Sequence, residues 1–278
     1  MNELLVDLHI HTNFSDGHFS PEEIVKYACE SGILAISITD HDSTDGIGPA
    51  LTAGDKYGVE IIPGVELSCH PENSSDEEIH ILGYYIKYED GNFQEQLKNF
   101  RGARLERARE ILRKLRALNI NVDADELFAK SESRSLGRMH FAKVLFSEGY
   151  VNSVKESFDR YLAYGKPAYV PKPHFESPKA IKMILDAGGI PILAHPQVGA
   201  DNIAVIKKLK EQGLAGIEAY AVKNRAQNTG KYLEWAKKLD LLVTGGSDFH
   251  GDTPFGEGAV SYDIVSSLKE YREKYNQK

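Results

Sequence analysis

The segment LLVDLHIHT (4–12) is followed by SPEEIVKYACESG (20–32) and then by LAISITDHD (34–42). The first and third segments are rich in Ile, Leu and Val, a composition typical of buried strands. The segment between them has an apolar residue every three or four positions, as an amphipathic helix does. A strand, a helix and a second strand in this order predict a parallel sheet with a helical crossover.

The middle segment also carries the start and stop signals of a helix. Ser20 is a typical N-cap, Pro21 occupies the first helical position, and Glu23 closes a capping box three residues after Ser20. Gly32 is a stop signal. The same Ser-Pro opening and Gly ending recur in SPKAIKMILDAGG (177–189), which predicts a second helix of this kind.

Five further apolar runs have strand character. They are VEIIPGVELS (59–68), EIHILGYYI (78–86), IPILAHP (190–196), LAGIEAYA (214–221) and LLVTGGSDFH (241–250). Helical patterns lie between most of them, so the whole series predicts seven parallel strands with helical connections.

Residues 92–168 interrupt this alternation. Asn92 to Asn119 reads as one long helix, and two more helical segments are expected near 136–148 and 153–164. Without this insertion, about 29 residues remain for each strand–helix unit, close to the roughly 31 of a (β/α)₈ barrel. We therefore expect an α/β fold, a distorted (β/α)₇ barrel built from residues 1–91 and 169–278, with a helical insertion domain at 92–168. A doubly wound open sheet is the alternative.

Composition narrows the function classes. The chain has 278 residues and a net charge of −8, which argues against a protein that coats long duplex DNA. No run approaches the roughly 18 apolar residues of a membrane span, and MNELLVDLHIHT lacks the pattern of a signal peptide. Its two cysteines are not clustered, which is typical of reduced packing residues. We expect a cytoplasmic protein with no membrane partner, and the oligomeric state is left open.

Six of the ten histidines and three carboxylates follow or lie within the predicted strands, at what should be one end of the sheet. A lone His after a buried strand is usually a hydrogen-bonded rim residue, but this coincidence recurs on six strands. Nine N and O ligands exceed the needs of one ion and suit two or three divalent ions bridged by carboxylates. The absence of Cys argues against a structural zinc site. The nine residues are His9, His11, Asp16, His41, Glu66, His80, His195, Asp248 and His250.

These residues stand in motifs that resemble, in order and spacing, those of the PHP (polymerase and histidinol phosphatase) family of metal-dependent phosphoesterases. The motifs are His9-x-His11, Thr39-Asp40-His41-Asp42, Gly64-Val65-Glu66, His80, Ala194-His195-Pro196 and Ser247-Asp248-x-His250. The resemblance implies a distorted seven-stranded barrel and a trinuclear catalytic site made by all nine residues. It assigns one metal to His9, His11, Glu66 and Asp248, a second to Glu66, His80 and His195, and a third to Asp16, His41 and His250.

The long helix after His80 and the motif Gly137-Arg138-x-His140-Phe141-Ala142 look like the stand-alone nucleoside 3′,5′-bisphosphate phosphatases of this family, some of which are also 5′→3′ exoribonucleases. The resemblance implies hydrolysis of the 3′-phosphate of such nucleotides, extending to short RNA from the 5′ end. Two or three divalent ions are expected, manganese first, with zinc or iron as alternatives. The competing readings are a phosphatase for another metabolite such as histidinol phosphate, and a non-catalytic accessory PHP module.

The predicted insertion carries a local positive charge. From 92 to 119 there are eight basic and three acidic residues, and Arg101, Arg104 and Arg107 recur every three positions on one helix face. This face is either solvated or an Arg cluster that grips a second phosphate bidentately at the barrel mouth. Arg138 is the companion candidate for substrate binding, and His140 either faces the ligand or packs its helix.

Four further carboxylates lie near the candidate ligands. Asp7, in phase with His9, either orients a ligand or satisfies backbone at the strand start. Asp40 and Asp42 flank His41 and are candidates for orienting it or assisting the leaving group. Glu218 ends the sixth predicted strand, but the family resemblance gives it no ligand role.

Overall fold

The computed structural model describes residues 4–72, 78–123, 137–171, 174–196, 201–222 and 226–276. The chain divides into two compact units. The barrel unit comprises Met1–Gln94 and His174–Lys278, and the insertion unit comprises Glu95–Pro173.

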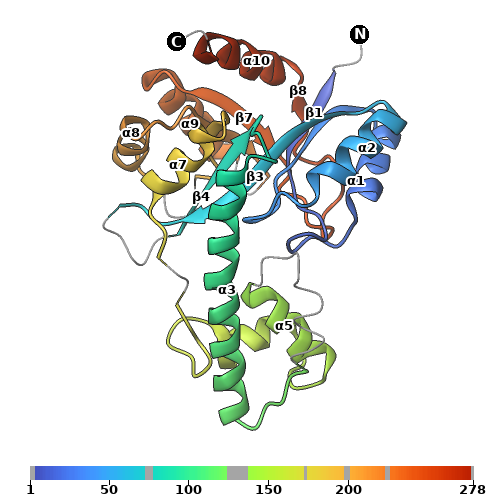
Figure 1. Cartoon of the computed structure of the whole chain (residues 1–278), viewed down its shortest axis with the longest axis vertical. Helices are drawn as coiled ribbons and strands as arrows, with labels where there is room; N and C mark the ends of the chain where they lie inside the picture. Colours follow the sequence, from blue (N-terminus) through green and yellow to red (C-terminus); the bar gives the residue numbers. More distant parts are fainter. Residues whose placement is uncertain are drawn as a thin grey trace. The chain divides into compact units, whose positions relative to one another are not determined.

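The barrel unit is built on one sheet whose strand order is β7-β6-β5-β4-β3-β2-β1-β8 (Figure 1). All seven predicted runs contain a strand. The bounds are β1 Leu5–Ile10, β2 Ile33–Ile38, β3 Glu60–Cys69, β4 Ile79–Tyr84, β5 Ile190–Leu193, β6 Gly216–Ala221 and β7 Leu242–Gly246, and a short β8, Val260–Ser261, pairs antiparallel with β1.

The two ends of this sheet approach each other beyond β7. Ile10 forms a parallel bridge with Phe249, and the backbone N–H of His11 donates to the carbonyl of Phe249 at 2.9 Å. This contact nearly closes the sheet, so the predicted distorted barrel is confirmed and the open doubly wound sheet is excluded.

The prediction of an entirely parallel sheet was wrong at β4. This strand is antiparallel to both β3 and β5, with Ser68 opposite His80. Only residues 70–78 connect β3 to β4, and a parallel connection needs a crossover of a dozen or more residues. His80 therefore lies at the start of its strand, whereas the candidate ligands of the preceding strands lie toward the ends of theirs. Because β4 runs in the opposite direction, its start lies at the same edge of the sheet as those ends.

Helices cover the outside of the barrel unit. They are α1 Pro21–Glu30, α2 Ile47–Tyr57, α7 Ser177–Asp186, α8 Ile203–Glu211, α9 Ala226–Lys238 and α10 Asp263–Asn276. The predicted capping box of α1 is present: Glu23 N–H donates to Ser20 Oγ at 3.4 Å, and Ser20 N–H donates to Glu23 Oε2 at 2.8 Å. In α7 the N-cap is Glu176 and not Ser177, which is already helical.

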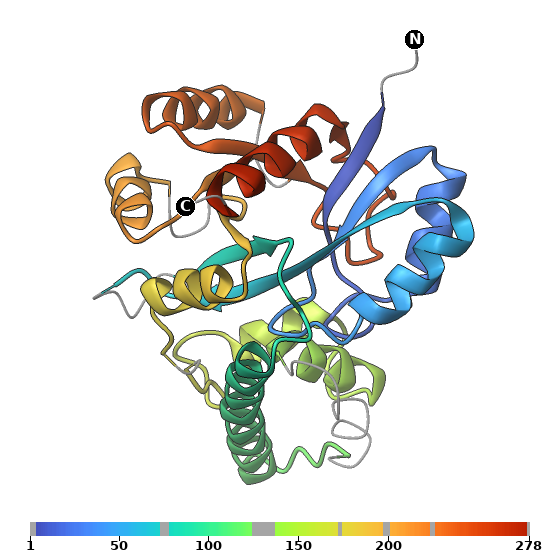
Figure 2. The ribbon, with the colours of Figure 1, turned by 45° about the horizontal axis from the view of Figure 1, so that its top comes forward.

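Two apolar clusters among the described residues of the barrel unit show how its sheet and helices pack. The first fills the barrel and includes Leu8, Ile192 and Tyr84, and α10 (dark red in Figure 2) packs against it through Val265 and Leu268. In the second core, side chains from β1 and β2 pack with those of α1 and α2. With the interior filled, polar side chains near the strand ends are left to form a site at the rim.

The insertion unit has its own core. It contains most of α3 (Gly91–Ala117), then α5 (Arg138–Ser147), α6 (Val154–Ser157) and a π-helical turn at Phe158–Leu162. Leu115, Phe141 and Leu145 are buried in it together with Leu162. The three predicted helical segments thus lie where the sequence placed them, the last as a short α-helix continued by the π turn.

Candidate active site

β1 brings the first pair of predicted ligands together. His9 lies within β1 and His11 directly follows Ile10, so their side chains share one face of the strand. Both are fully buried, and their Nε2 atoms are 3.1 Å apart. At this distance one ring nitrogen donates a hydrogen bond to the other, or both direct their lone pairs at a shared metal ion.

Glu66 is the hub of the candidate site. It is fully buried in β3, and its Oε1 lies 2.8 Å from Nδ1 of His80 and 3.2 Å from Nε2 of His195. Its Oε2 lies 3.2 Å from Nε2 of His11 and 2.9 Å from Nδ1 of His41. One carboxylate therefore contacts ligands from four other segments, which is the position of a bridging ligand.

Asp16 gathers a second cluster beside this hub. Its Oδ1 lies 3.3 Å from Nε2 of His250, and its Oδ2 lies 3.9 Å from Nε2 of His41. The rings of His11 and His250 stack with their centroids 4.1 Å apart. Asp248 reaches the first cluster, with Oδ1 3.2 Å from Nε2 of His11.

The nine predicted ligands fall into four overlapping groups, and within each group the ligand atoms lie within 4.8 Å of one another. The first group contains Asp16, His41 and His250, which the resemblance assigns to the third metal, together with His11. Each of the last two groups combines residues that the resemblance assigns to different metals. The groups are His11, Asp16, His41 and His250; His9, His11 and Glu66; His9, His195 and Asp248; and His41, Glu66 and His80.

The donor set fits divalent metal ions. Imidazole nitrogens and carboxylate oxygens without thiolates suit manganese, iron or zinc. Nδ1 of His195 is buried and forms no hydrogen bond with any residue the structure describes. Buried polar atoms are seldom left in this state, so an atom of this kind in the cluster fits a centre that binds metal.

Backbone strain marks two of the candidate ligands. The φ angles of His195 and Asp248 are 25° and 52°. Both lie in the left-handed region, which residues other than Gly rarely adopt. Strain of this type costs about 1–3 kcal/mol per residue and persists where the surroundings enforce it. Each is the second residue after a short strand, where this backbone turn directs the side chain into the cluster.

Charges in the cluster shift its pKa values strongly. Burial alone would raise the pKa of Glu66, but His41, His80 and His9 hold it well below 4.5. Burial would lower the pKa of His11, yet Asp248 and Glu66 raise it to about 10. For His41 burial prevails and lowers the pKa to about 4. The site thus holds a dense, mutually neutralising set of imidazoles and carboxylates.

The side chains of Asp40 and Asp7 accept hydrogen bonds from backbone N–H groups. Both are buried, and Asp40 accepts hydrogen bonds from Thr12 N–H at 2.7 Å and from Ser15 Oγ at 2.6 Å. It thereby braces the loop that carries Asp16. Asp7 accepts from the backbone N–H groups of His9 and Ser247, which corresponds to the backbone alternative, and burial raises the pKa of Asp7 to about 6.

Two carboxylates outside the predicted set contact ligand imidazoles. Oε1 of Glu78 lies 2.8 Å from Nε2 of His80, and Oε1 of Glu218 lies 3.0 Å from Nδ1 of His9. For Glu78 the period-two spacing to His80 was an available signal. For Glu218 the available signal was its place at the end of the sixth predicted strand, but no local pattern pointed to His9, which is 209 residues away in sequence.

The PHP domain model matches residues 7–170 of this chain. The chain belongs to the PHP domain family. A 5′-3′ exoribonuclease from Haemophilus influenzae is 33% identical over 273 residues, which cover 97% of this chain and 98% of the relative. A 3′,5′-nucleoside bisphosphate phosphatase from Chromobacterium violaceum is 31% identical and covers 91% of this chain and 88% of its own length.

A solved structure of similar sequence has the same fold. It is a protein from Bifidobacterium adolescentis described as a metal-dependent phosphoesterase, with a TM-score of 0.85 and 28% identity over 95% of this chain and 94% of the relative. Together with the His and carboxylate cluster, these matches identify this PHP protein as a metal-dependent phosphoesterase, a hydrolase. Among the described residues, no helix has the length and apolarity to cross a membrane.

The candidate substrate-binding residues of this PHP protein all lie in the insertion unit. Arg104 and Arg107 are buried, and Arg101 is partly exposed. Nε of Arg107 donates to the carbonyls of Val170 and Pro171 at 2.9 and 3.1 Å, so this side chain ties α3 to the end of the unit.

The motif at the start of α5 also has a local role. Nη1 of Arg138 donates to the carbonyl of Leu162 at 3.3 Å, and its guanidinium lies over the ring of Tyr169. Nδ1 of His140 accepts a hydrogen bond from Gly137 N–H at 3.1 Å. His140 therefore caps the first turn of α5, in keeping with the helix-packing alternative.

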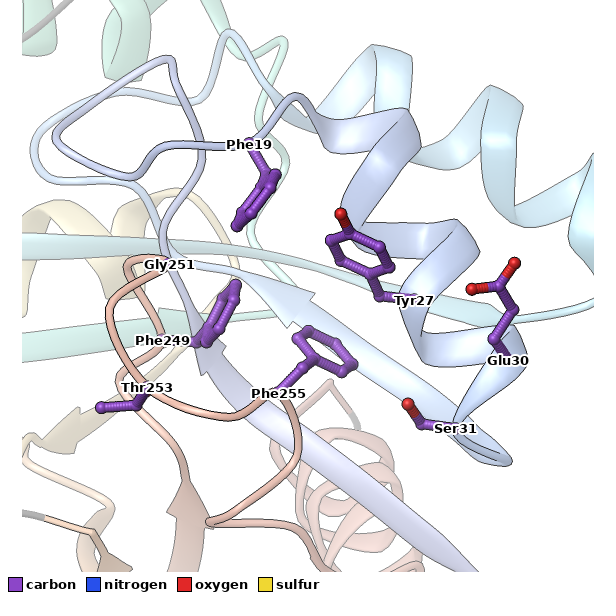
Figure 3. Close-up of a pocket in the computed structure, with 8 residues that line it drawn as sticks. All are labelled: Phe19, Tyr27, Glu30, Ser31, Phe249, Gly251, Thr253 and Phe255. Carbon is purple, nitrogen blue, oxygen red and sulfur yellow. The ribbon is translucent and has the colours of Figure 1, made fainter.

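An aromatic pocket lies between α1 and the segment that follows β7 (Figure 3). The rings of Phe19, Tyr27, Phe249 and Phe255 line it, and none of the nine candidate ligands does. Phe249 stacks on Phe19 at 6.0 Å and meets Phe255 edge-on at 5.1 Å. Since Phe249 stands between Asp248 and His250, this packing anchors the segment that carries both ligands.

Proposed function

We propose that this PHP protein removes the 3′-phosphate from nucleoside 3′,5′-bisphosphates and also degrades short RNA from its 5′ end. The observation that carries the proposal is the cluster of six imidazoles and three carboxylates in overlapping groups. The printed activities of the Haemophilus and Chromobacterium relatives, which match nearly the whole chain, support this choice of substrate.

The proposed centre holds two or three ions, with manganese as the proposed metal and zinc or iron as the other candidates. When bound, the ions supply Lewis acidity, which activates water and neutralises phosphate oxygens. The chain holds its ligands ready for this task. Glu66 bridges the clusters, and the strained turns at His195 and Asp248 direct their side chains inward.

We further propose that residues 92–168 form the substrate-binding domain. A bisphosphate or an RNA 5′ end presents a second phosphate that the metal centre does not need for hydrolysis. Arg104 and Arg138 are the proposed partners of this phosphate, with Arg101, Arg107 and His140 as neighbouring candidates. A guanidinium binds a phosphate through two parallel hydrogen bonds, which favours Arg over Lys for this role. We also propose that the reaction takes place in the cytoplasm.

The test is hydrolysis by manganese-loaded protein of a nucleoside 3′,5′-bisphosphate, of the matching 5′-monophosphate and of a 5′-phosphorylated oligoribonucleotide. We expect phosphate release from the first and mononucleotide release from the third, with little turnover of the second. Histidinol phosphate in the same panel distinguishes the general phosphatase. No release from any substrate with manganese, iron or zinc would contradict the proposal and favour an accessory module.

A further inference from the structure

The side chain of Glu218 lies behind two of the proposed metal ligands. Glu218 belongs to β6 and is fully buried. Its Oε1 is 3.0 Å from Nδ1 of His9, and its Oε2 is 2.8 Å from the backbone nitrogen of His195. A single carboxylate therefore contacts ligand residues from β1 and from the end of β5.

The contact with His9 determines which ring nitrogen carries the proton. A carboxylate only accepts hydrogen bonds, so Nδ1 of His9 is the donor in this contact. In the neutral ring, the form that binds metal, Nε2 then keeps its lone pair, and it lies 3.5 Å from a carboxylate oxygen of Glu66 and equally far from one of Asp248. This is the tautomer that a metal ligand needs on the side facing the cluster.

The contact with His195 supports a strained turn. The N–H of His195 donates to Oε2, and the φ angle of this residue is 25°. The sheet register shifts between Glu218 and Tyr220, where β6 pairs with β7. Irregularities of this kind change the direction of a side chain, and here the carboxylate points between two ligand strands.

We propose that Glu218 is a positioning residue of the metal centre, which holds His9 in the Nδ1–H tautomer and holds the backbone of His195. The inference rests on the proposed metal centre and adds a carboxylate that is not itself one of the nine ligands. Hydrogen bonds from metal-binding imidazoles to carboxylates orient the ring and make it a stronger ligand.

The decisive variant is Glu218→Gln, which has nearly the same shape. The backbone N–H of His195 can only donate, so the Gln oxygen must face it and the Gln NH₂ must face Nδ1 of His9. Nδ1 then becomes an acceptor, the proton moves to Nε2, and the ring loses its lone pair toward the metal. Loss of such a partner lowers metal affinity by about 10- to 100-fold.

The experiment measures zinc affinity by competition with a chromogenic chelator for wild type, Glu218→Gln and a control, Glu60→Gln. Glu60 is a strand carboxylate of the same barrel whose partners are Tyr262 and Lys269. We expect the loss for Glu218→Gln alone. Long-range ¹H–¹⁵N spectra of zinc-loaded wild type should show the proton of His9 on Nδ1.

The outcomes separate this inference from the metal centre itself. Wild-type affinity in a folded Glu218→Gln protein would overturn the positioning role while leaving the centre intact. A wild-type protein that binds no zinc would overturn both. If Glu218→Gln does not fold, the spectrum of the wild type decides: a proton on Nε2 of His9 contradicts the inference, and a proton on Nδ1 supports it.

Discussion

Oε1 of Glu66 lies 3.2 Å from Nε2 of His195, although 129 residues separate them along the chain. The whole insertion unit falls within this interval. The two side chains meet because β4 pairs with both β3 and β5 and returns the chain to the same sheet before the insertion begins. The insertion therefore enlarges the protein without interrupting the candidate site.

Metal removal should abolish activity without unfolding the chain. The buried imidazoles and carboxylates of the empty cluster still pair with one another, so the fold is expected to remain. Dialysis against a chelator, with metal content checked by mass spectrometry, should eliminate hydrolysis while the circular dichroism spectrum stays unchanged. Added manganese should restore turnover. Full activity in verified metal-free protein would refute the metal assignment.

His41→Ala and Asp248→Ala should each reduce kcat by more than about 100-fold, because loss of a ligand should exceed the 10- to 100-fold typical of an outer partner. Both side chains belong to the metal-ligand groups. The measurement is steady-state hydrolysis at saturating manganese. His18→Ala is the control, since His18 is more exposed and outside every group. Retained activity in either ligand variant would show that its group is not part of the centre.

Arg104→Ala should raise KM for a nucleoside 3′,5′-bisphosphate by about 10- to 100-fold, because the variant loses a charge-assisted hydrogen bond to the second phosphate. KM for a monophosphate test substrate should change little. Arg109→Ala is the matched control on the same helix, because Arg109 is exposed and paired with Glu106. If the ratio of the two KM values stays at its wild-type level, Arg104 does not bind the second phosphate.

Asp40→Ala should lower the free energy of unfolding by about 2–4 kcal/mol, because it leaves the buried donors of Thr12 and Ser15 without their acceptor. Urea unfolding of the metal-free protein measures this change. Asp252→Ala, at an exposed position, should shift the free energy by less than about 0.5 kcal/mol. Equal values for the two variants would mean that Asp40 does not brace its loop.

Leu115→Ala should destabilise the insertion unit by about 2–5 kcal/mol, since Leu115 is fully buried in that unit's own core. Zinc affinity should remain at the wild-type value, because all nine candidate ligands lie in the barrel unit. Chelator competition and denaturant unfolding test the two halves of this prediction. A parallel loss of zinc affinity would show that the two units fold as one.

The amino-acid sequence alone was sufficient to predict the seven main strands in order, the presence of a helical insertion after the fourth of them, and a set of nine candidate ligands that the structure brings together. These features are local: apolar runs mark strands, Ser20 and Gly32 delimit a helix, and pairs such as His9 and His11 share a strand face through the period of two. The direction of β4 could also be inferred from the sequence, because the connection at residues 70–78 is shorter than the dozen or so residues that a helical crossover between parallel strands needs.

The tertiary structure decided how the ligands group and what stands behind them. Glu66 meets His195, and Glu218 meets His9, across intervals of 129 and 209 residues. Such contacts follow from which strands are neighbours in the barrel and from backbone turns with positive φ at their ends. Strand neighbours and turn angles arise from the packing of the whole barrel core, so no local pattern of residues encodes them.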